Sequence, residues 1–188
     1  MARVIISPEN QIQRINALII KLQDFEKIPL TDLQKKPHEK AWNSIEVLRH
    51  MVIGHNAYRE KIDTTIQKLP VSSDQLNGVK SRSIPSFLIK RFPPIEGEIK
   101  FKMKTGKIFE PSTEMGGVDL PKEFAEMQDC LIHLYDSVQA YRLKQVEKIK
   151  FNSAIGPVVR FNVAEACEFI LCHNERHFRQ IENNLADS

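Results

Sequence analysis

Four stretches of the chain place apolar residues at every third or fourth position, which is the spacing of one face of a helix. At the start of the first stretch, Ser7 and Pro8 provide an N-cap followed by proline at the first helical position. Pro29 lies just past its end. The pattern predicts a helix between Pro8 and Pro29 with the apolar stripe Ile12, Ile15, Leu18, Ile19, Leu22 and Phe25.

The second and fourth stretches begin with the same signal. In "NSIE" and in "NVAE", Asn43 and Asn162 are followed three residues later by Glu46 and Glu165, as in a capping box. The second stripe ends at Pro70, and the fourth continues towards Leu185. The third stretch opens near Asp119 and Pro121 with a near-heptad seam: Phe124, Met127, Leu131, Leu134, Val138 and Tyr141.

Four amphipathic helices, with no comparable strand-type alternation, predict an all-α fold. We expect an up-down four-helix bundle with a long irregular crossover between the second and third of these helices. A chain of 188 residues is most simply one domain, so residues 1–188 are taken as a single bundle.

The irregular crossover is the segment 71–118. Five of the seven glycines fall in it, together with Pro85, Pro93, Pro94 and Pro111, so no long helix is expected there. One short helix around "SFLIKR" is predicted. The run "IKFKMKTGK", with Lys100, Lys102 and Lys104, is either a solvated loop or edge strand or a lip that binds anions.

Composition narrows the classes of function. The net charge of +3 is too small to indicate nucleic-acid binding, and no apolar run approaches the roughly 18 residues that span a bilayer. The start of the chain lacks the apolar length of a signal peptide, so a cytoplasmic protein is expected. Cys130, Cys167 and Cys172 form no CxxC pair and are expected to be free, buried thiols.

Two histidines in the fourth helix are the first candidates for chemistry. At about 100° per residue, His173 and His177 fall within the apolar arc, so both are predicted to point inward. Their i, i+4 spacing allows two imidazoles to share a metal ion. The same spacing is compatible with two core histidines bonded to carbonyl groups.

The second helix adds His50 and His55. His55 lies inside the apolar stripe, whereas His50 lies about 120° from its centre. Periodicity alone therefore favours His55 as the buried residue, either in the core or as a donor in a pocket. Gly54 and Ala57 form a groove of small residues beside His50, which suits either a ligand or close helix packing. The helical wheel leaves His50 undecided.

A family resemblance favours His50. "AWNSIEVLRHM" followed far downstream by "HNERHFRQI" is similar to the two signatures of the DinB/YfiT-like superfamily of metal-dependent enzymes. Members begin the second helix with tryptophan and place a histidine eight residues later, as Trp42 and His50 do here. Their last helix carries HxxxH, then glutamine and an aliphatic residue, which match His173, His177, Gln180 and Ile181. The 71–118 segment is longer than the family's usual connection.

The resemblance implies a divalent metal held by His50, His173 and His177, with zinc or nickel first and iron or manganese as alternatives. Three imidazoles leave coordination positions for water or substrate, as in catalytic sites. Characterised relatives use low-molecular-weight thiols such as bacillithiol, mycothiol or glutathione, and others are suspected hydrolases. A small-molecule substrate, such as a thiol, is therefore expected, and the oligomeric state, with a homodimer as one option, is left open.

Other residues near these motifs have two interpretations each. Trp42 is either a core plug or a platform for substrate, and Glu46 either caps its helix or orients His50. Gln180 and Arg176 match the family's last helix, with surface or packing roles as the alternative. His38 and His133 belong to no recognisable constellation.

Two functions from different classes follow. One is an enzyme with a three-histidine metal site that activates a small thiol or water, resembling a thiol S-transferase or a hydrolase. The other is a bundle that binds a metal or small molecule without turnover, as a stress-response protein would.

Overall fold

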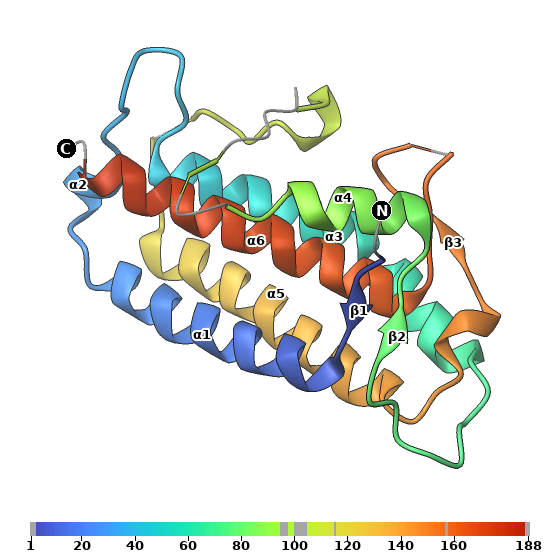
Figure 1. Cartoon of the computed structure of the whole chain (residues 1–188). Coiled ribbons are helices and arrows are strands. Elements are labelled where there is room, and N and C mark those ends of the chain that lie inside the picture. Colours follow the sequence, from blue (N-terminus) through green and yellow to red (C-terminus); the bar gives the residue numbers. More distant parts are fainter. Residues whose placement is uncertain (1–2, 95–97, 100–104, 115, 157, 187–188) are drawn as a thin grey trace.

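The computed structural model describes residues 3–94, 98–99, 105–114, 116–156 and 158–186. Four long helices dominate it: α1 (Pro8–Glu26), α3 (Ser44–Lys68), α5 (Leu120–Tyr141) and α6 (Val163–Ala186). They lie side by side as a bundle (Figure 1). The all-α four-helix bundle predicted from the periodicity is confirmed.

The remaining elements are short. They comprise α2 (Leu30–Leu33), α4 (Ser83–Arg91), two 3₁₀ turns, η1 (Lys107–Phe109) and η2 (Val146–Lys148), and four two-residue strands. Strand β1 (Ile5–Ile6) pairs antiparallel with β2 (Val79–Lys80), and β3 (Phe151–Asn152) pairs antiparallel with β4 (Arg160–Phe161). Such short strands lie below the length at which alternation is recognisable, so the sequence did not indicate them.

The capping hydrogen bonds expected at the four predicted helix starts are formed. Ser7 accepts from the amide of Asn10 at the start of α1, and Asp119 accepts from the amide of Lys122 at the start of α5. Both capping boxes are complete. Asn43 and Glu46 exchange bonds of 2.9 and 2.8 Å, and Asn162 and Glu165 exchange bonds of 2.9 and 3.0 Å. Local sequence therefore determined where these helices begin.

Ion pairs between the helices show in which direction each helix runs. Arg14 on α1 reaches Glu168 and Glu175 on α6, and Lys21 reaches Glu182, so these two helices run the same way. On α3 and α5, Arg49 meets Glu123 and Arg59 meets Asp129, so these two are also parallel. Tyr141 at the end of α5 donates to Gln11 at the start of α1, so these two helices are antiparallel. The order is therefore α1 up, α3 down, α5 down, α6 up. This refines the up-down prediction, because the long crossover returns the chain to the end at which α3 began.

The crossover contacts the bundle at several points in its described part. Its α4 packs against α6, and its β2 extends the chain's N-terminal strand (Figure 1). Arg82 forms a 2.6 Å ion pair with the fully buried Glu165 at the start of α6. The predicted short helix is confirmed as α4. The basic run, interpreted from the sequence as either a solvated loop or edge strand or an anion-binding lip, has Lys100, Lys102 and Lys104 outside the described residues.

The core runs through the centre of the bundle and is formed by the inward faces of all four helices. The largest fully buried side chains include Tyr141, Phe161 and Phe178. Cys130, Cys167 and Cys172 are free and buried, as expected. Within the part of the chain that is described, no helix combines the length and apolarity needed to cross a membrane.

Candidate metal centre

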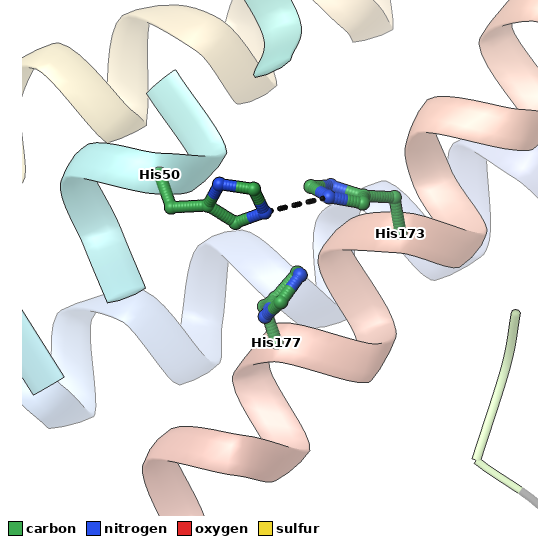
Figure 2. A group of neighbouring side chains, drawn as sticks. All are labelled: His50, His173 and His177. Atoms are coloured by element: carbon green, nitrogen blue, oxygen red, sulfur yellow. Dashed lines mark hydrogen bonds between the residues drawn. The ribbon is translucent and has the colours of Figure 1, made fainter. Parts of the chain in front are cut away.

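Three histidines converge between α3 and α6. His50 projects from α3, and His173 and His177 project from successive turns of α6, so that the rings face one another (Figure 2). One ring nitrogen from each lies within 4.8 Å of the other two. The Nε2 atoms of His50 and His173 are 3.2 Å apart. The structure thus brings together the three residues that the motifs singled out.

Helix geometry explains the convergence. His173 and His177 are one turn apart on a single face of α6, as their i, i+4 spacing predicted. Asn184 near the end of α6 donates to the carbonyl oxygen of Trp42, which precedes α3, so the two helices are antiparallel. This pairing places His50, in the second turn of α3, opposite the HxxxH pair. The helical wheel could not decide this, because it describes one helix without its neighbour.

The hydrogen bonds leave lone pairs facing the common point. His50 Nδ1 lies 2.7 Å from the carbonyl oxygen of Phe109 in η1, and a carbonyl only accepts, so the proton is on Nδ1 and Nε2 is bare. In the same way, His177 Nδ1 donates to Gln180 Oε1 at 2.9 Å. With a bare Nε2 on His50, His173 Nε2–H donates across the 3.2 Å contact. Moving that proton to Nδ1 gives three bare nitrogens.

Burial keeps the three imidazoles neutral. Desolvation lowers the pKa of His173 from 6.5 to about 3, and the charge of Arg176 and contact with His50 act in the same direction. The pKa of His177 is well below its usual value, first by desolvation and then by its histidine neighbours. Burial also lowers the pKa of His50, partly opposed by its bond to Phe109. Neutral imidazole is the form that binds a metal ion.

These residues fit a divalent metal. Two nitrogens at the usual zinc distance of 2.0–2.1 Å in a tetrahedral site are roughly 3.3 Å apart, close to the 3.2 Å between His50 and His173. His50 and His177 each donate their other ring N–H to an oxygen, which is how metal-bound histidines are usually oriented. The donor set of three neutral nitrogens suits zinc, nickel or iron better than calcium or magnesium.

The histidines line a cavity of about 530 Å³. Its walls are mostly apolar and aromatic, with Trp42, Phe109, Phe169 and Ile155 among them, and Arg176 and Gln180 add polar groups. This volume is within the range of about 300–1,000 Å³ typical of small-molecule sites. The centre is therefore accessible to a ligand of modest size.

Several interpretations of single residues can now be decided. The half-buried indole of Trp42 packs against the core and also lines the cavity, 4.9 Å from the centre of the His50 ring. Glu46 caps its own helix and pairs with Lys36, so the bond to His50 comes from Phe109 instead. Gln180 orients His177. Phe109 was missed, because a backbone carbonyl in an irregular segment leaves no signal in the sequence.

His55 belongs to the core and not to the cavity. Its Nε2 lies 2.9 Å from His133 Nδ1, and His133 Nε2 lies 2.8 Å from Asp63, so His133 joins a chain of three residues that the sequence did not suggest. The Nδ1 of His55 is buried and has no hydrogen-bond partner among the described residues. Burial, then His133 and Arg59, lowers the pKa of His55 to about 3.

Acid is expected to destabilise the protein through His55. Because its folded pKa of about 3 lies below the usual 6.5, the unfolded chain takes up this proton first. The stability is present above pH 6.5 and decreases as the pH falls towards 3, by about 3 kcal/mol at pH 4. Urea unfolding from pH 7 to pH 4 measures this. His55→Gln should flatten the slope, whereas His38→Gln, at an exposed site, should not. Equal slopes in all three proteins would contradict the assignment.

Gly54 on α3 faces the ring of His173. A Cβ atom at this position would lie 3.4 Å from His173 Cε1, an ordinary contact. Gly54→Ala is therefore expected to keep metal affinity and to raise stability by about 1 kcal/mol, the usual gain over glycine in a helix. Gly54→Leu should displace the His173 ring and weaken metal binding at least about tenfold. Metal titration and urea unfolding of both variants test this, and unchanged affinity in the leucine variant would contradict it.

Comparison with known proteins finds one solved structure with a similar fold. No family model and no curated protein sequence matches the chain. Among solved structures, it resembles YfiT from Bacillus subtilis, a probable metal-dependent hydrolase with an unusual four-helix bundle topology. The TM-score is 0.60, with 94% of this chain and 85% of YfiT covered and 13% sequence identity. The resemblance to YfiT expected from the motifs is thus confirmed at the level of the fold.

Proposed function

We propose that this protein is a metal-dependent enzyme in which His50, His173 and His177 hold one divalent ion, zinc or nickel first. The observation that carries the proposal is the convergence of one ring nitrogen from each histidine within 4.8 Å, at a cavity that admits a small molecule. The likeness to a probable metal-dependent hydrolase with the same fold supports it.

The proposed reaction is hydrolysis of a small molecule or transfer of a low-molecular-weight thiol to it. His50, His173 and His177 would hold the ion, and the chemistry it would supply is a lowered pKa of bound water or thiol, which would give a nucleophile near neutral pH. No aspartate, glutamate or lysine lines the cavity in the described part of the chain. A carboxylate general base is therefore not part of the proposal.

The chain's own residues orient the histidines and exclude water. Phe109 and Gln180 fix the rings of His50 and His177 through their Nδ1 protons. Trp42 covers one side of His50, and Phe92 lies near His173, with ring centres 6.3 Å apart. These apolar neighbours shield the nitrogens from competing water and strengthen electrostatic interactions within the cavity.

Activity assays with defined metals test the function. Protein freed of metal and reloaded with Zn²⁺, Ni²⁺, Fe²⁺ or Mn²⁺ would be given small esters and amides, and separately bacillithiol, mycothiol or glutathione with an electrophilic acceptor. We expect one metal to support turnover of one class, and His50→Ala to abolish it. Tight metal binding without turnover of either class would favour the non-catalytic bundle.

A further inference from the structure

Arg176 is a charged group at the metal cavity for which the described part of the chain provides no partner. It is half-buried on α6, next to His177, and its side chain lines the cavity. Among the described residues, no carboxylate lies within ion-pair distance of its guanidinium and no hydrogen bond to it is formed.

Other partly buried arginines of the bundle are neutralised. Arg14 pairs with Glu168 and Glu175, each at 2.6 Å, and Arg82 pairs with Glu165 at 2.6 Å. Arg49 pairs with Glu123 at 2.5 Å. A desolvated guanidinium is costly when it lacks an anion, because it has five donors to satisfy. Arg176 is the exception, and it lines the cavity, where an incoming ligand can supply the anion.

The charge of Arg176 is close to the proposed metal ligands. It directly precedes His177 on α6 and lines the same cavity as His50, His173 and His177. An anionic group bound to Arg176 would therefore lie beside the proposed metal. The guanidinium offers a planar pair of donors that matches a carboxylate.

The rest of the cavity sets the character of the ligand. Trp42, Phe109, Phe169 and Ile155 form apolar walls, and Arg176 is the one charged lining residue in the described part of the chain, with the histidines neutral. One positive charge balances one negative charge. A singly charged carboxylate with an apolar or aromatic body could pack that body against the apolar walls and pair its charge with Arg176.

We infer that Arg176 is the specificity-determining residue of the site and that the substrate is a small carboxylate with an apolar body, its carboxylate paired with Arg176. This inference rests on the proposed function for the identity of the reaction. The binding step itself depends on the cavity and on Arg176, so it can be measured on protein without metal.

The sole tryptophan provides the readout. Trp42 lines the cavity, so its fluorescence reports a bound ligand. The probes are 3-phenylpropanoate and its neutral analogue 3-phenylpropanamide, titrated into metal-free protein dialysed free of chelator. We expect the carboxylate to bind at least about tenfold more tightly than the amide, as for a charge-assisted pair. Arg176→Gln should remove that preference and leave amide binding unchanged.

Two further variants make the result decisive. Arg176→Lys keeps the charge but loses the paired donors, so an intermediate preference is expected. Arg179→Gln makes the same change of charge on the same helix, at a residue that pairs with Glu182 outside this cavity, and should behave as wild type. Thermal unfolding of each variant verifies that the bundle is intact.

Each contrary outcome identifies what failed. Equal affinity for carboxylate and amide in the wild type, or an equal loss in Arg179→Gln, overturns the inference. Tighter binding of 2-phenylethyl phosphate than of the carboxylate overturns it in favour of a phosphate substrate. A carboxylate preference in a protein that binds no metal would reject the proposed function and leave the role of Arg176 standing.

Discussion

Replacing His177 by alanine is expected to abolish stoichiometric metal binding. His177 supplies one of the three nitrogens that the described residues bring to the centre, and its Nδ1 is already held by Gln180. Removal of groups that merely orient a ligand costs about 10- to 100-fold in affinity, so loss of a ligand should cost more than about 100-fold. Elemental analysis and metal titration would measure one ion per wild-type chain and almost none in His177→Ala.

Thermal unfolding gives an independent measurement of the same centre. An ion at 100 times its dissociation constant stabilises the native state by about 2.7 kcal/mol, or a Tm increase of about 5–10 °C for a chain of this size. Wild type and His38→Ala, changed at an exposed histidine, should show this increase, whereas His177→Ala should not. An equal increase in all three proteins would place the metal elsewhere and remove the basis of the proposed function.

Replacing Glu165 by alanine is expected to cause the largest loss of stability. This fully buried carboxylate accepts from the amide of Asn162 at 3.0 Å, from the amide of Arg82 at 2.8 Å and from the guanidinium of Arg82 at 2.6 Å. Its removal leaves the amides of Asn162 and Arg82 without this acceptor. It also takes the carboxylate from the guanidinium of Arg82, which keeps only the carbonyl oxygen of Arg160 among the described residues, so the total cost is about 3 kcal/mol or more. Urea unfolding measures the loss.

Glu46 is the matched control for Glu165. It occupies the same position in an identical capping box and is equally buried, but its ion pair is with Lys36, only ten residues away. Glu46→Ala should therefore cost about 1–2 kcal/mol, the usual range for a cap. Because Glu165 also holds the crossover through Arg82, its variant alone should be cleaved faster by protease within 71–118. Equal losses of stability and equal rates of cleavage in the two variants would show that Glu165 acts only as a helix cap.

The helices were predictable because their signals are local. A capping box requires only an asparagine and a glutamate three residues apart, and the apolar stripe requires only a 3.6-residue period. Asn43 with Glu46 and Asn162 with Glu165 therefore marked both helix starts correctly. The inward direction of His173 and His177 followed from the same period.

The candidate site was only partly predictable. His50 was undecided on the helical wheel and was chosen through a family resemblance, while periodicity favoured His55, which proved to be a core residue bonded to His133. The parallel course of α3 and α5 was also absent from the local pattern. The sequence did not reveal the role of the Phe109 carbonyl, nor that Arg176 has no partner among the described residues, since both depend on neighbours far along the chain.

Sequence by itself determined four amphipathic helices, their caps and an HxxxH pair facing inward. Each of these properties depends on residues within one or two helical turns, where backbone geometry fixes the spacing of side chains. Only the tertiary structure decided that α3 crosses α6 with His50 opposite His173, that the crossover brings a carbonyl to His50, and that a cation faces the cavity without an acid. These depend on packing between segments more than 50 residues apart, and no local rule contains that information.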